Sequence, residues 1–218
     1  MKSLLAGCAL ILATLGSQAQ ATTITYSTSI TNAQPDWAST LSVAKFDPTL
    51  GTLTGIQFNL MGSVTGTIYV ENTDAAPANI SETLSATLTL TRPDSSSIIV
   101  TYPSAMLTDS FNAFDGTVDF AGTSGAIHGP ITTSASASYT ALATDFALFT
   151  GMGNIVLPVT AIGTSFVSGP GNLASGFSTS ASAFLDVIYT YDNVPEPTSL
   201  LLLGGGLLAA GWRRRKAA

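Results

Sequence analysis

The sequence predicts an all-β domain, an antiparallel β-sandwich or jelly-roll-like fold, over residues 22–192. Apolar and polar residues alternate there with a period of two, β-branched residues dominate the alternating runs, and turn-forming residues separate these runs. No long stretch of this region has convincing helical spacing. Because every second side chain of a strand lies on the same face, each alternating run can bury one face in a core.

Three segments show the alternation most clearly: "TGTIYVEN" (65–72), "SATLTLT" (85–91) and "FLDVIYTY" (184–191). The residues expected to face the core are Ile68, Val70, Ala86, Leu88, Leu90, Leu185, Val187, Tyr189 and Tyr191. Turn signals such as "FDPTLG", "NTDAAP" and "TRPDSS" lie between the runs, and predict roughly eight to ten short strands. The Gly-rich segment 149–176, which contains Pro158, is expected to form an edge strand or a long loop.

The N-terminus has the three parts of a secretory signal peptide, residues 1–21. Lys2 supplies positive charge, an apolar stretch follows, and Ala19 and Ala21 form a small-x-small cleavage pattern. We therefore expect the Sec translocon and signal peptidase as partners, with cleavage after Ala21. An alternative is lipidation at Cys8, but the main apolar stretch follows this cysteine instead of preceding it. Cleavage after Ala21 would leave a mature chain without cysteine, and hence without a disulfide or a thiol nucleophile.

The charge of the body argues against one class of partner. Between residues 22 and 195 there are twelve carboxylates and only two cations, Lys45 and Arg92, so two minus twelve gives a formal charge of −10. Nucleic-acid binding requires clustered lysine and arginine side chains that neutralise phosphates. We therefore expect no nucleic-acid partner.

The sequence offers few residues for catalysis. His128, in "GAIHGP", is the only histidine, and in this context it is predicted to be a solvated turn residue. No G-x-S-x-G segment marks a serine nucleophile. We therefore predict no catalytic residues, no cofactor and no enzymatic activity. A secreted hydrolase, the less favoured alternative, would require His128 or two carboxylates to converge in a cleft.

Asp109, Asp115 and Asp119 are the best acidic cluster in the sequence and are weak candidates for binding Ca²⁺. Their spacing fits neither the helix-loop-helix calcium loop nor the nonapeptide calcium repeat. The preferred interpretation is that Asp115 and Gly116 form a hairpin turn and that Asp119 faces water. No metal site is therefore predicted.

Residues 193–218 form a tail that differs from the body. Its apolar part, 200–212, would make a helix about 20 Å long, a marginal transmembrane helix for a hydrocarbon layer of about 30 Å. The residues of interest are Pro195, Glu196 and Pro197 before this part, Gly204, Gly205 and Gly206 within it, and Arg213, Arg214, Arg215 and Lys216 after it. The prolines favour an extended segment, the glycines let another helix approach, and the cations should stay in the cytoplasm. These features favour a processing signal over the alternative, a permanent anchor.

The tail resembles the PEP-CTERM sorting domain of Gram-negative bacteria, since a Pro-Glu-Pro, an apolar run and an arginine cluster occur in that order. The resemblance implies recognition by exosortase, a membrane-embedded cysteine protease, with cleavage near Pro195–Pro197. It also implies export in a bacterium that makes extracellular polysaccharide. The body, in segments 41–75 and 114–125, resembles the choice-of-anchor E domain, a resemblance that implies no activity.

The leading hypothesis is an exported, non-enzymatic envelope or extracellular-matrix protein. The tail would tether it transiently to the inner membrane until exosortase cleaves it, and the released domain would associate with exopolysaccharide or biofilm. The alternative is a carbohydrate-binding or adhesive surface module, Ca²⁺-dependent if the acidic residues bind the ion. An exposed row of aromatic side chains or an acidic calcium pocket on one sheet face would favour that alternative.

Overall fold

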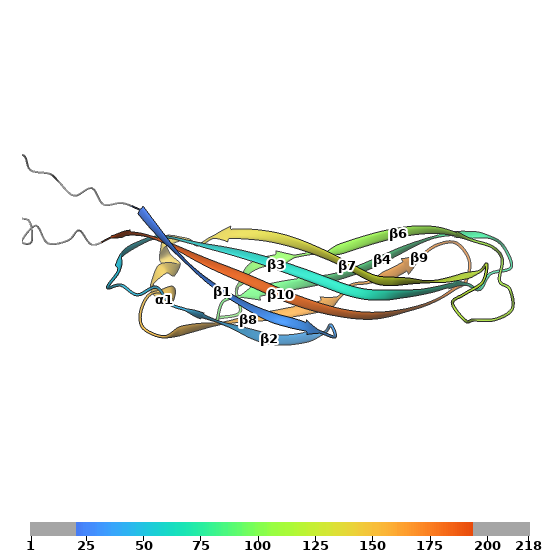
Figure 1. The fold of residues 1–218 in the computed structure, drawn as a ribbon, viewed down its shortest axis with the longest axis horizontal. Coiled ribbons are helices and arrows are strands. Elements are labelled where there is room, and N and C mark those ends of the chain that lie inside the picture. The colour runs from blue at the N-terminus through green and yellow to red at the C-terminus, as the bar shows by residue number, and fades with distance from the viewer. Residues whose placement is uncertain (1–20, 194–218) are drawn as a thin grey trace, which may run out of the picture.

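The computed structural model describes residues 21–193, which form a two-layered β-sandwich (Figure 1). The signal peptide, expected to form an N-terminal helix, and the expected C-terminal hydrophobic helix lie outside the described residues. The elements are β1 (Ala21–Ala33), β2 (Trp37–Ala44), β3 (Gly51–Asn72), β4 (Ala78–Thr91), β5 (Ser97–Thr101), β6 (Ser104–Phe111), β7 (Gly125–Thr140), η1 (Ala143–Asp145), α1 (Phe146–Phe149), β8 (Asn154–Gly163), β9 (Phe166–Ser168) and β10 (Leu173–Asn193). The predicted all-β class is confirmed.

All the strand pairs within the two sheets are antiparallel. One sheet has the order β1-β10-β3-β7, and the other has the order β2-β8-β4-β5. Two further strands, β6 and β9, pair with the first half of β4, whereas β5 and β8 pair with its second half. The strand β4 therefore pairs with every other strand of the second sheet except β2.

The core lies between the sheets, and the predicted inward faces are confirmed. Each of the nine residues predicted to face the core is buried, with at most 8% of its surface exposed. The threonines between them on β4, at positions 87, 89 and 91, are only partly buried. This matches the expectation for strands that bury one face against the opposite sheet.

Two strands are longer than predicted. β3 has 22 residues and β10 has 21, so these are not short strands. Gly62 and Gly66 lie inside β3: a Cβ at Gly62 would meet side chains of the opposite sheet, and a Cβ at Gly66 would meet both the neighbouring β10 and Leu84 of the opposite sheet. The Gly-rich segment 149–176 contains one internal and one edge strand, because β8 lies between β2 and β4, whereas β9 pairs with β4 alone among the described strands. Pro158 is accommodated because the pairing of β8 with β4 covers only residues 159–163.

The two ends of the described chain lie at the same end of the sandwich (Figure 1). Ala21 at the start of β1 pairs with Asp192 near the end of β10, and Asn193 pairs with Gly51. β3 then runs the length of the sheet to Asn72. Within residues 21–193, no helix combines the length and apolar character needed to cross a bilayer.

Candidate functional site

Three ionisable side chains occupy inward-facing positions on three neighbouring strands. Glu82 lies in the core-facing row of β4, between Ile80 and Leu84. Asp109 lies in the partly buried row of β6, and His128 lies in that of β7. In each row the other members are mostly apolar, so the three polar side chains interrupt the hydrophobic pattern at one place.

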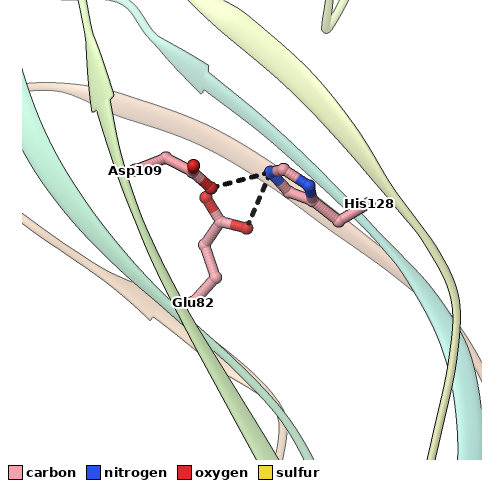
Figure 2. A group of neighbouring side chains, drawn as sticks. All are labelled: Glu82, Asp109 and His128. Atoms are coloured by element: carbon pink, nitrogen blue, oxygen red, sulfur yellow. Dashed lines mark ion pairs between the residues drawn. The ribbon is translucent and has the colours of Figure 1, made fainter.

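The three side chains converge from both sheets (Figure 2). His128 Nε2 lies 2.9 Å from Asp109 Oδ2 and 3.4 Å from Glu82 Oε2. Glu82 is completely buried, whereas 26% of the His128 side chain and 39% of the Asp109 side chain are exposed. We refer to these three residues as the Glu82 cluster. It has one fully buried carboxylate at its base and two partly exposed groups between it and the solvent.

The environment of Glu82 is unfavourable for a negative charge. Burial raises the pKa of Glu82 above its ordinary value, the charge of His128 lowers it, and the charge of Asp109 adds to the increase. Both carboxylate oxygens of Glu82 are buried, and neither has a hydrogen-bond partner among residues 21–193. His128 Nε2 is also buried and lacks a well-directed hydrogen bond. Buried carboxylates are normally paired or hydrogen-bonded, so this arrangement is incomplete as it stands.

One donor atom from each residue lies within 4.8 Å of the donors from the other two. An imidazole nitrogen and carboxylate oxygens are ligand types used by divalent metal ions in proteins. The Glu82 cluster is therefore the place in the described chain where a cation is most readily held.

The prediction for His128 was wrong. It lies within β7, paired with Ile68 of β3, and is not a solvated turn residue. Glu82 was missed in the sequence, although a signal was available. It occupies the only charged position in the period-two series Ala78, Ile80, Glu82, Leu84, Ala86, Leu88 and Leu90.

The structure separates the three aspartates that the sequence grouped together. Asp109 belongs to the Glu82 cluster, whereas Asp115 and Asp119 are exposed in the loop after β6. The Asp115 carboxylate accepts the backbone N–H of Thr117, and that of Asp119 accepts the N–H of Ala121. These local bonds, with a positive φ of 104° at Gly116, are typical of turns. The predicted hairpin turn at Asp115 and Gly116 was wrong, because β6 pairs with β4 and β7 pairs with β3, whereas Asp119 faces water as expected.

A second buried carboxylate lies on β3. Glu71 is fully buried, and its Oε1 accepts a hydrogen bond from the hydroxyl of Ser124, which is also fully buried. The neighbouring Asn72 side chain donates to the backbone oxygens of Ala76 and Asn112. These contacts attach two connecting segments, 73–77 and 112–124, to the end of β3, which is a structural role.

The other predicted site residues lie outside the described residues, apart from Ala21 at the start of β1. They are Ala19 of the signal peptide and all the named residues of the tail.

Residues 193–216 match the PEP-CTERM protein-sorting motif. The chain carries this sorting signal. The motif indicates a protein that is exported and sorted by exosortase, with a membrane-anchoring tail before processing. The predicted motif, with Pro195, Glu196 and Pro197 near its start, is thereby confirmed.

The chain is also weakly similar to solved structures of infectious bursal disease virus. The VP2 subviral particle has 15% identity and a TM-score of 0.21, over 82% of this chain and 38% of that chain. The structure of the Gx strain has 12% identity and a TM-score of 0.19, over 82% and 37%. The chain thus spans less than two fifths of these viral chains, and at such TM-scores the similarity assigns neither fold nor function. No curated protein matches the chain.

Proposed function

We propose that the protein is a non-enzymatic component of the cell envelope or extracellular matrix, delivered by exosortase and associated with exopolysaccharide. The observation that carries this proposal is the PEP-CTERM motif at residues 193–216. In this proposal the Sec translocon and signal peptidase act on the N-terminus, and exosortase then removes the tail. The β-sandwich, which we assign to the choice-of-anchor E type, is the part that stays at the destination.

The position of the motif supports removal of the tail without damage to the fold. β10 ends at Asn193, and Pro195 follows two residues later. A cut near Pro195–Pro197 would leave every strand of the sandwich intact. Pro195 and Pro197 also oppose helix formation before the apolar segment, so a protease would meet an extended backbone there.

The body suits a structural role in an aqueous polymer. Its acidic charge and its many threonine and serine side chains keep a long β-sandwich hydrated without a dense charged surface. Strands as long as β3 and β10 also make the domain elongated (Figure 1). An elongated, hydrated domain is well suited to act as a spacer or filler between polysaccharide chains.

The processing step is tested by the intact mass of the exported protein in hosts with and without exosortase. We expect loss of Arg213 and all later residues only when exosortase is present, and loss of residues 1–21 in both hosts. A chain with Pro195 and Pro197 replaced by alanine should keep its tail. A wild-type mass that retains Arg213 in the host with exosortase would overturn the proposal.

The destination is tested by fractionation of cells that do or do not synthesise exopolysaccharide. We expect the processed protein in the matrix fraction of the first and in the culture medium of the second. An unchanged distribution would contradict the association with polysaccharide while leaving the processing step intact. Binding of the purified protein to defined glycans, lost on adding a Ca²⁺ chelator, would instead support the adhesive alternative.

A further inference from the structure

We propose that Glu82, Asp109 and His128 form a binding site for a divalent transition-metal ion of the Zn²⁺ class. The site would join β4 and β6 of one sheet to β7 of the other. It is independent of the sorting function, because no residue of the tail takes part in it.

The first support is the state of Glu82. Its carboxylate is completely buried, points into the cluster (Figure 2), and has no hydrogen-bond partner for either oxygen among the described residues. A carboxylate buried without donors is strongly disfavoured. A cation bound between Glu82, Asp109 and His128 would supply the interaction that the Glu82 carboxylate lacks.

The second support is the spacing of the donor atoms. Around a tetrahedral Zn²⁺ with bonds of about 2.0–2.1 Å, neighbouring ligand atoms lie roughly 3.3 Å apart. His128 Nε2 lies 2.9 Å from Asp109 Oδ2 and 3.4 Å from Glu82 Oε2. The side chains therefore need only small rotations to receive an ion. Asp109 and His128 are partly exposed, so the cluster lies close to the solvent.

The mixture of donors decides the class of ion. Ca²⁺ takes six to eight oxygen ligands and Mg²⁺ prefers oxygen in octahedral geometry. One imidazole nitrogen with two carboxylates suits Zn²⁺ and its neighbours in the transition series. The proposed ion is thus different from the Ca²⁺ considered for Asp109, Asp115 and Asp119; the carboxylates of the last two accept hydrogen bonds within turns instead.

The competing explanation is an ion pair in which a protonated His128 is shared by Glu82 and Asp109. Such an ion pair needs no metal and would be disturbed, not stabilised, by one. Metal titration therefore separates the two explanations.

The test is a titration of the exported protein, purified without a histidine tag, with Zn²⁺ and separately with Ca²⁺. We expect saturable binding of one Zn²⁺ per chain, a rise in the unfolding temperature that a chelator reverses, and no such response to Ca²⁺. Because His128 is the only histidine in the sequence, its imidazole proton signals in NMR report ligation without any variant. No shift of these signals at saturating Zn²⁺ would overturn the proposal.

Variants locate the site. Zn²⁺ binding should be weakened by more than about tenfold in each of three variants, Glu82→Gln, Asp109→Asn and His128→Asn. Loss of a residue that only hydrogen-bonds to a metal ligand already weakens metal binding by about 10- to 100-fold. Asp119→Asn is the matched control, since this exposed aspartate lies in the loop between β6 and β7, and it should bind Zn²⁺ as the unaltered chain does. Folding of each variant is checked by its unfolding transition in chelator. Equal binding by the folded variants and the control would place the ion elsewhere and refute the assignment.

Discussion

The hydroxyl of Ser124 donates a 2.5 Å hydrogen bond to Oε1 of Glu71, and both side chains are fully buried. Ser124→Ala should lower the free energy of unfolding by about 1.5–3 kcal/mol, because it leaves a buried carboxylate without this donor. Urea denaturation measures the change. Ser27→Ala is the matched control, since Ser27 donates a similar bond to Asp186 at an exposed position and should cost about 0.5 kcal/mol or less. Equal costs for the two variants would contradict the importance assigned to burial.

Gly62 marks a close approach of the two sheets. A Cβ at this position would lie 2.5 Å from Thr101 Oγ1 and 2.8 Å from Leu88 Cδ1. Gly62→Ala should therefore destabilise the domain by about 1–3 kcal/mol through overpacking. On the same strand, a Cβ at Gly55 would meet its nearest atom at 3.5 Å, so Gly55→Ala should be neutral or slightly stabilising. Thermal unfolding of the two variants distinguishes these outcomes.

Tyr189 is buried in the core, and its hydroxyl donates a 3.0 Å hydrogen bond to the backbone oxygen of Ala44. Tyr189→Phe should cost about 0.5–1.5 kcal/mol of unfolding free energy at neutral pH. Tyr102→Phe, at a side chain that is 65% exposed, should cost almost nothing.

The cost of Tyr189→Phe should also depend on pH. Burial raises the pKa of Tyr189, and nearby Tyr26 adds to the increase. Above about pH 10, tyrosine in an unfolded chain loses its proton, whereas folded Tyr189 keeps it. The unaltered chain therefore loses stability as the pH rises past this value, and the Phe variant loses less. Urea curves at pH 7 and pH 10.5 should show the difference between the two chains shrinking; a constant difference would contradict the buried phenol.

Replacement of Glu82 should show how much its buried carboxylate destabilises the domain when no metal is bound. In the presence of chelator, Glu82→Met should raise the free energy of unfolding by about 1 kcal/mol or more, because an apolar side chain replaces a desolvated carboxylate. In saturating Zn²⁺ the order should reverse, since only the unaltered chain gains binding energy. If Glu82→Met is the less stable chain even in chelator, the carboxylate already has a favourable partner and the argument for a missing cation fails.

The fold class and the inward faces could be predicted because a period of two is a local property of the sequence. The faces of Leu88 and Val187 followed directly from their neighbours along the chain. Strand length was harder to predict, since glycines such as Gly62 can either end a strand or permit close contact between sheets.

The Glu82 cluster could not be predicted as a site, because it depends on distant pairings. Asp109 approaches Glu82 through the pairing of β6 with β4, and His128 reaches both from the other sheet. The position of Glu82 within an apolar row was visible, but a single sequence does not say which side chains face it. The sorting motif, in contrast, is contiguous, and so it could be identified from the sequence alone.

Ala21 and Asn193 lie at one end of the sandwich, and the Glu82 cluster lies far from that end. Gly51 pairs with Asn193, and Ile68, further along the same strand, pairs with His128. At about 3.3 Å per residue, the stretch of β3 between them spans roughly 55 Å. While the tail holds the protein in the membrane, the Glu82 cluster therefore lies towards the end of the sandwich that is farther from the attachment of the tail.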